Sequence, residues 1–163
     1  MRNVSFSCGG IAHWGIPVGV APGEVKVAFE AQLGQRLAFE DGPVIFLKTR
    51  FVGLDDIAAD GTIPGGFGHV EAQDAEGDFL YGRVDWSADG GADFAGRGAL
   101  WGGRFTFSSG TGKFDEAHGE INAKLWAVPQ YLDAAMPPTE PIMVYAFLEG
   151  AGALDAPGVP AGD

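Results

Sequence analysis

Hydrophobic and polar side chains alternate along several short stretches of this chain. In residues 44–52, Ile45, Leu47, Thr49 and Phe51 fall on one face, and Phe46, Lys48 and Arg50 fall on the other. A period of two residues is the mark of a β-strand with one buried face. The predicted strands are residues 4–8, 25–29 with a continuation at 36–40, 44–52, 67–73, 79–86, 104–108, 121–126 and 142–148.

The best-defined pair of predicted strands flanks the turn residues Asp74-Ala75-Glu76-Gly77, so we expect a β-hairpin there. If Glu71 lies opposite Tyr81 and His69 lies opposite Arg83, the hairpin has one polar and one apolar face. The polar face then carries His69, Glu71, Gln73, Tyr81, Arg83 and Asp85. The apolar face carries Val70, Ala72, Leu80, Val84 and Trp86.

Glycine, proline and aspartate separate the strands, and the 27 glycines have no three-residue period that would indicate collagen. Residues 11–23, 55–66 and 87–98 are predicted loops, and residues 57–59 and 131–136 offer at most a turn or two of helix. About eight strands joined by short turns predict an all-β fold, a single antiparallel β-barrel, with a two-sheet sandwich as the alternative. We expect one barrel domain over residues 1–149, of which 1–24 form an irregular arm and loop, and a loose tail over 150–163.

The formal charge of −12 changes the picture for partners, because an acidic surface repels nucleic acids and anionic membranes. A single cysteine, Cys8, fits a reducing compartment, and no apolar run approaches the roughly 18 residues of a membrane span. We therefore expect a cytoplasmic protein without nucleic-acid or membrane partners. The predicted strand 142–148 is apolar on both faces, which is typical of a barrel wall or a subunit interface and makes self-association an expectation.

Several kinds of catalytic site lack their sequence signature. The histidines His13, His69 and His118 are too far apart for a metal-binding spacing, and no Gly-x-Ser-x-Gly elbow occurs. The segment Gly110-Thr111-Gly112-Lys113 does not have the glycine spacing of a phosphate-binding loop. The sequence predicts no metal and no cofactor.

The polar face of the hairpin is the first candidate site. If it points into the barrel, His69 or Glu71 would move a proton, Tyr81 would donate a hydrogen bond, and Arg83 would hold a carboxylate or enolate. In the alternative, the same face lies outside and its residues form a solvated lattice of modest ion pairs.

Aromatic residues are the second candidate. They would line a hydrophobic cavity that binds substrate, or they are simply core. The candidates for this lining are Phe46, Trp86, Trp101, Phe105, Phe107, Trp126 and Tyr145, with Trp14 in a segment that could cover a barrel mouth.

The stretch from Gly102 to Glu120 joins a phenylalanine-rich strand to glycine-rich turns. Together with Asp78 after Glu76-Gly77, the pairs and runs Gly102-Gly103, Gly110-Thr111-Gly112-Lys113-Phe114 and Gly119 resemble the layout of the allene oxide cyclase-like barrels. These calycin-like folds include plant dirigent proteins and bacterial spirotetronate cyclases. The resemblance covers residues 67–126, and Ser109 stands where that layout has a second glycine.

This resemblance implies a barrel that binds a small apolar polyene, polyketide or aromatic molecule and catalyses its cofactor-free cyclisation or isomerisation. It equally allows a non-catalytic carrier or a dirigent-like protein, and a lyase or hydrolase acting on an aromatic substrate is a third option. The resemblance also implies a homodimer or homotrimer that associates through sheet faces. The glycine-rich stretch itself is expected to mark the fold rather than to carry chemistry.

Overall fold

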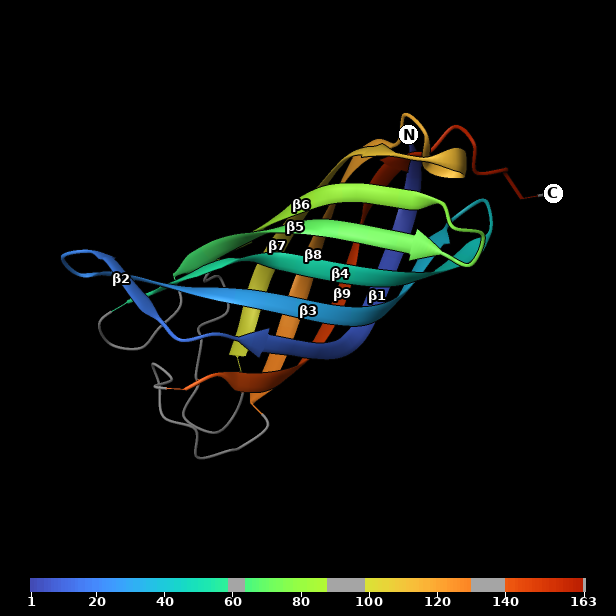
Figure 1. Cartoon of the computed structure of the whole chain (residues 1–163). Helices are drawn as coiled ribbons and strands as arrows, with labels where there is room; N and C mark the ends of the chain where they lie inside the picture. The colour runs from blue at the N-terminus through green and yellow to red at the C-terminus, as the bar shows by residue number, and fades with distance from the viewer. Residues whose placement is uncertain (59–63, 88–98, 130–139, 163) are drawn as a thin grey trace.

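The structure is a computed structural model that describes residues 1–58, 64–87, 99–129 and 140–162. Within these ranges it consists of β-strands and one short 3-10 helix (Figure 1). The strands are β1 (Arg2–Trp14), β2 (Val18–Ala21), β3 (Glu24–Phe39), β4 (Val44–Ile57), β5 (Gly65–Asp74), β6 (Phe79–Ser87), β7 (Ala99–Gly110), β8 (His118–Pro129) and β9 (Ile142–Asp155), and the helix is η1 (Gly112–Phe114).

Eight of these strands form a closed antiparallel β-barrel. Each strand from β3 to β9 pairs with the next, and β1 closes the ring by pairing with both β3 and β9. Strand β2 pairs with β3 beyond the ring and projects from one end of the barrel (Figure 1). The prediction of a single antiparallel barrel is therefore confirmed. The sandwich alternative is wrong, because the sheet is continuous around the molecule.

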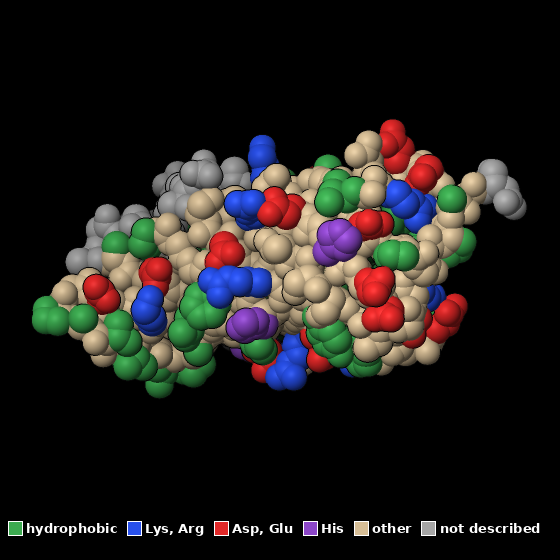
Figure 2. Space-filling view, turned by 90° about the horizontal axis from the view of Figure 1, so that it is seen from above, with side chains coloured by type: hydrophobic (Ala, Val, Ile, Leu, Met, Phe, Trp, Pro, Cys, Tyr) green, Lys and Arg blue, Asp and Glu red, His purple; other side chains and the backbone are tan. Residues whose placement is uncertain are grey.

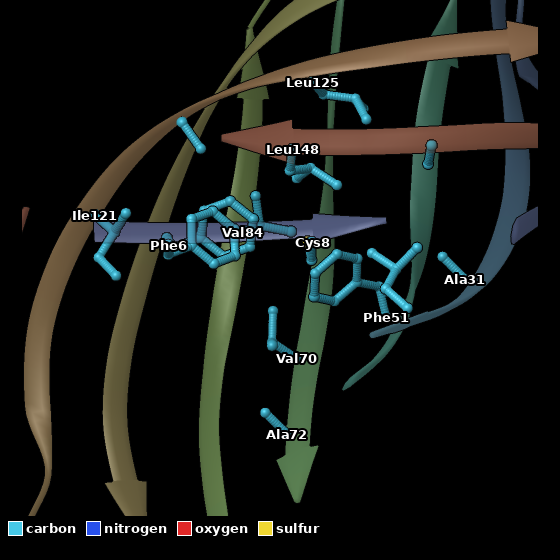
Figure 3. Close-up of a cluster of buried hydrophobic side chains, with 14 of the residues drawn as sticks. Phe6, Cys8, Ala31, Phe51, Val70, Ala72, Val84, Ile121, Leu125 and Leu148 are labelled. Atoms are coloured by element: carbon cyan, nitrogen blue, oxygen red, sulfur yellow. The ribbon is translucent and has the colours of Figure 1, made fainter. Parts of the chain in front are cut away.

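Side chains on the barrel strands alternate between the interior and the outer surface. In β4, Leu47, Thr49 and Phe51 are buried, whereas Lys48 and Arg50 are exposed, as the pattern of residues 44–52 predicts. Figure 3 shows side chains from strands far apart in the sequence, such as Phe6 of β1 and Leu148 of β9, meeting inside the barrel. Removal of these apolar side chains from water is the main favourable contribution to folding.

The first 24 residues differ most from the sequence-based expectation. Residues 4–8 were predicted as a first strand within an irregular arm and loop over 1–24. The strand is confirmed but runs much further, because Arg2–Trp14 is a barrel strand and Val18–Ala21 is the projecting strand. Val4, Phe6, Cys8, Ala12 and Trp14 face the interior. The glycines of this segment hide the two-residue period, because Gly9 and Gly10 contribute a side chain to neither face.

Other strands are longer than predicted. Residues 25–29 and 36–40 belong to one sixteen-residue strand, β3, and β4 continues to Ile57 into a segment that was predicted as loop. Strand β9 continues to Asp155, so residues 150–155 of the predicted loose tail are barrel wall, and Ala156 and Val159 beyond them are buried. The predicted turns of helix over 131–136 and the loop over 88–98 lie outside the described residues.

One end of the barrel is closed by η1 and by the segment after β9. The side chains of Phe114, Ala117, Ala156 and Val159 are buried at this end. The Arg2 guanidinium donates hydrogen bonds to the carbonyl oxygens of Val159 (2.9 Å) and Pro160 (3.2 Å), which fixes the segment to the start of β1. Trp14, Asp55 and Trp101 lie at the opposite end, which we call the tryptophan end.

The glycine-rich stretch forms a compact turn unit at the closed end. The Asp78 carboxylate accepts a hydrogen bond from the backbone N–H of Lys113 (3.0 Å), and Thr111 Oγ1 accepts one from the backbone N–H of Phe79 (2.9 Å). The Lys113 ammonium forms ion pairs with Asp74 and Glu76, both at 2.8 Å. These contacts tie the β5–β6 turn to the turn after β7, so the stretch has the structural role that was expected of it.

Candidate functional site

The polar face of the β5–β6 hairpin lies on the outside of the barrel. Its register is the predicted one, with His69 opposite Arg83 and Glu71 opposite Tyr81. His69, Glu71 and Arg83 are exposed and Tyr81 is partly exposed. The version of the hypothesis in which these groups line the interior is therefore wrong, because the apolar side chains of Val70 and its neighbours occupy the inner face.

On the outer surface these residues take part in a lattice of charged side chains. Arg83 pairs with Asp85 at 2.6 Å, Arg50 with Glu30 at 2.9 Å, and the Arg83 guanidinium also covers the ring of Phe67 at 4.4 Å. Figure 2 shows acidic, basic and histidine side chains interspersed on one face of the molecule. His69, Glu71 and Tyr81 do line a shallow surface hollow, which Arg83 does not reach. Exposed pairs of this kind contribute at most about 1 kcal/mol each.

The predicted aromatic lining is divided between the two sides of the barrel wall. Trp86, Trp101, Phe105 and Phe107 are buried inside. Phe46, Trp126 and Tyr145 point outwards, with 70%, 39% and 41% of their surfaces exposed, and so cannot line an interior cavity. The error has a simple cause: aromatic type does not show which face of a strand a residue occupies, whereas alternation with a securely buried neighbour does.

A small cavity lies inside the barrel near the tryptophan end. Its volume is about 30 Å³, roughly the space of two water molecules. Trp14 and Trp101 stack beside it with ring centroids 5.9 Å apart and an interplanar angle of 12°, and Trp86 lies 6.3 Å from Trp101 at 59°. The rest of the lining is almost entirely hydrocarbon, from residues such as Phe51, Leu125 and Val144.

Asp55 is the exception in this lining. Its side chain is 1% exposed, and its Oδ1 atom has no hydrogen-bond partner. Burial, together with the neighbouring charge of Asp56, raises the pKa of Asp55 well above its ordinary value, and a hydrogen bond with the Trp14 indole opposes this only in part. The protonated form is thereby favoured, since an isolated carboxylate is costly in an apolar site.

The local sequence builds this site by alternation and by small residues. Phe51, Gly53, Asp55 and Ile57 are successive inward positions of β4, so the strand period turns Asp55 into the barrel and Asp56 outwards to Lys26. The cross-strand partner of Asp55 on β5 is Gly66, where an added Cβ would lie 2.5 Å from Asp55 Oδ1. Likewise a Cβ at Gly103 would lie 2.6 Å from the Trp86 ring. Two glycines therefore make the room that the carboxyl and the indole occupy.

Sequence reasoning missed Asp55 because the pair Asp55-Asp56 reads as the start of a polar loop. The signal that could have revealed it is the continuation of the two-residue period beyond Phe51. A second polar contact inside the barrel was also missed: Thr49 donates a hydrogen bond to Gln35 Oε1 at 2.8 Å, and both side chains are buried. Nearby, burial raises the pKa of the Cys8 thiol to about 12, so this cysteine stays protonated and unreactive.

The carboxylates of Asp74, Glu76 and Asp78 also cluster, with one oxygen of each within 4.8 Å of the others. The Lys113 ammonium already forms ion pairs with two of the three carboxylates, those of Asp74 and Glu76. Burial alone would raise the pKa of Asp74, but Lys113 and the backbone N–H groups of Asp78 and Glu76 hold it below its ordinary value. The cluster is accordingly a structural part of the turn unit.

Comparison of this chain with protein-family models, with curated proteins and with solved structures finds no match. Among the described residues there is also no helix long and apolar enough to cross a membrane. The geometry of the site is therefore the main guide to its function, and the motif resemblance remains an expectation.

Proposed function

We propose that this barrel binds a small molecule at its tryptophan end, with Asp55 as the proton donor to the one polar group of the ligand. The observation that carries the proposal is a buried carboxyl with an unpartnered oxygen, inside a cavity otherwise lined by indole and hydrocarbon. Pockets of this composition, with one placed polar group, are typical of small-molecule sites. The ligand is then largely apolar and carries one hydrogen-bond acceptor.

The favoured activity is cofactor-free isomerisation or cyclisation. A carboxylic acid kept neutral by an apolar site can donate a hydrogen bond or a proton to a carbonyl oxygen as an enol forms. The Trp14 indole holds the carboxyl in a defined orientation, which limits the reorganisation needed during the reaction. In this mechanism the indoles exclude water and position the ligand, and Asp55 carries the chemistry.

A non-catalytic carrier is the second candidate, and one observation favours it. Among the described residues that line the cavity, Asp55 is the single titratable group, whereas isomerases that move a proton between two carbons generally need a base as well as an acid. The cavity of about 30 Å³ is also far below the several hundred Å³ that encloses a polyene. The site thus fits a small molecule, or one end of a larger molecule.

The test uses 2-butanone, a small ketone, and the variants D55N and D56N. D56N is the matched control, because it makes the same carboxyl-to-amide change at the next residue, whose side chain points outwards to Lys26. Binding is followed through the indole N–H resonances, and catalysis through exchange of the ketone α-protons in D2O. We expect 2-butanone to shift the resonances of the cavity tryptophans in wild type and D56N, and exchange to fall about 100-fold or more in D55N.

Binding without accelerated exchange in wild type would establish the carrier and exclude the catalytic version. If 2-butanone left all the cavity indole resonances unchanged, and the amine and alcohol probes described below did the same, a binding site at the tryptophan end would be excluded.

A further inference from the structure

The ligand class follows from the surroundings of Asp55. We propose that the cavity takes a small primary amine, which accepts the proton of Asp55 and remains as an ammonium group between that carboxylate and the indole rings. This inference rests on the proposed function, since it presupposes a binding site at the tryptophan end. It specifies which acceptor the ligand offers.

The first argument is charge. Asp55 Oδ1 has no hydrogen-bond partner. The cation on the neighbouring strand β3, Lys26, is paired with Asp56 on the outer face of the barrel. Within the described residues, the barrel therefore supplies no counter-ion for an ionised Asp55. A buried carboxylate is stable only with a paired cation, and here a ligand ammonium can provide it.

The second argument is the identity of the rings. Indole attracts cations more strongly than the other aromatic side chains, and the attraction grows when the cation is removed from water. Trp14, Trp86 and Trp101 all line the cavity. The rings of Trp14 and Trp101 are nearly parallel, and the ring of Trp86 is tilted against that of Trp101. A ketone or alcohol would gain only the contact area of these rings, whereas an ammonium gains their electrostatic attraction as well.

The third argument is size. A cavity of about 30 Å³ has room for the ammonium nitrogen and about one attached carbon. Ala127, Ala146 and Val144 give the remaining wall an apolar lining, which suits a methyl or methylene group. The small volume argues against a trimethylammonium group and against a long alkyl chain inside the cavity, because both are much larger than two water molecules.

The proton balance of binding is simple. The amine enters as the free base, its nitrogen lone pair takes the proton from the Asp55 carboxyl, one O–H bond breaks, and one N–H bond forms. Entry as a neutral molecule avoids the cost of carrying a naked charge into the barrel. When the amine in solution is already an ammonium ion, the same complex forms and the Asp55 proton is released to the solvent.

Few other charges act on this pair. The positions opposite Asp55 are Val27 on β3 and Gly66 on β5, and the indoles come from β1, β6 and β7, so none of these is titratable. Among the described residues, the charge that acts on Asp55 is that of Asp56, the next residue of β4, which is paired with Lys26. The pH dependence of binding should therefore report mainly on Asp55.

The experiment compares methylamine with methanol, which has the same number of heavy atoms and a similar size but cannot become a cation. Both are titrated into wild type, D55N and D56N, and binding is followed by the indole N–H resonances. In wild type we expect amine affinity to fall as the pH is lowered through the pKa of Asp55, approaching tenfold per pH unit, because protons compete for the carboxylate. Alcohol affinity should instead rise, because the protonated carboxyl is the hydrogen-bond donor.

In D55N, amine affinity should drop at least tenfold, whereas methanol affinity should be affected far less, because the asparagine amide can still donate to its oxygen. D56N should retain amine affinity within about twofold; a loss equal to that in D55N would mean that the amine merely follows the net negative charge of the protein. Equal affinity for amine and alcohol in wild type, with the same pH dependence, would overturn the amine inference and leave the binding site standing. Should D55N fail to fold, the opposite pH trends in wild type still decide the question.

Discussion

Asp55 is surrounded by indole and hydrocarbon side chains, an apolar environment that would suit a leucine better than a carboxyl group. Nothing in the described chain compensates its charge, and its surroundings are built to fit it, since Gly66 leaves space for the carboxyl and Trp14 donates to it. Such a residue lowers the stability of the folded protein once it ionises. Retention of an acid at this position is therefore best explained by its use in binding.

This cost predicts a specific dependence of stability on pH. The pKa of Asp55 is raised in the folded state, so the folded protein keeps a proton that the unfolded chain loses above its ordinary carboxyl pKa. The stability contribution of Asp55 is thus fully present at low pH and is lost as the pH rises through the folded-state pKa. The asparagine of D55N does not titrate. Between the unfolded-state and the folded-state pKa of Asp55, the free energy of unfolding of D55N should therefore rise relative to that of wild type by up to about 1.4 kcal/mol per pH unit.

Urea unfolding of both proteins between pH 4 and pH 8 measures this difference. A difference that stays constant over the whole range would mean that Asp55 has the same pKa in the folded and unfolded states, contrary to its burial.

Single residues were the scale at which sequence reasoning failed most often. The polar positions His69, Glu71 and Arg83 were correctly placed on one face, but nothing in a single hairpin says whether that face is inside or outside. Asp55 was hidden because a charged pair normally marks a loop. Both failures have one physical origin: the interior is defined by contacts between strands far apart in the chain.

At the scale of elements, the β5–β6 hairpin is the part of the fold that the sequence predicts best. Alternation of polar and apolar residues fixes which side chains share a face, and the short turn fixes the register, which is the one observed. Of strand β1, only residues 4–8 were predicted, because Gly9 and Gly10 interrupt the pattern before the strand ends at Trp14. Its inward positions nevertheless include the large side chains of Val4, Phe6 and Trp14, so the two-residue period is present at these three apolar residues.

The turn unit at the closed end gives a prediction for an element. Gly112 has φ of +55°, and a Cβ there would lie 1.9 Å from the Asp78 carboxylate. We expect G112A to lower the free energy of unfolding by about 2 kcal/mol or more, from left-handed backbone strain together with displacement of the Asp78–Lys113 hydrogen bond.

The matched control is G34A. Gly34 lies on the outer face of β3 with open space where its Cβ would be, so alanine there should be neutral or slightly stabilising. Chemical denaturation of both variants is sufficient. Equal stability of G112A and G34A would show that the turn unit tolerates displacement of Asp78.

The whole molecule has two unlike ends. The closed end is covered by η1 and the segment after β9 and is tied down by Arg2, whereas the tryptophan end carries the cavity and the projecting strand β2. Exposed hydrophobic side chains, Val18 and Val20 among them, gather at the projecting tip (Figure 2). The fold class was predictable from the number of strands and turns, but this polarity was not, because it depends on closure of the barrel.

The segment after β9 provides a test at this scale. It was predicted to be loose, but Val159 is 4% exposed and packs at the closed end. V159A should therefore lower the free energy of unfolding by about 1–3 kcal/mol through lost burial and the cavity left behind. P157A, at an exposed position two residues earlier, should change stability by less than about 0.5 kcal/mol. Thermal unfolding that does not distinguish V159A from wild type would restore the loose-tail interpretation.

Closure of the barrel through β1 and β9 also has a consequence for how the chain folds as it is made. The strands from β3 to β9 can pair one after another as they leave the ribosome, each with a neighbour close in sequence. Strand β1 can find β3 early, but its other edge must wait for β9, more than a hundred residues later. Until then β1 and the strand at the growing end both present open backbone edges, where pairing with another nascent chain competes with ring closure. Productive synthesis of this protein should therefore depend on how quickly its last strand arrives.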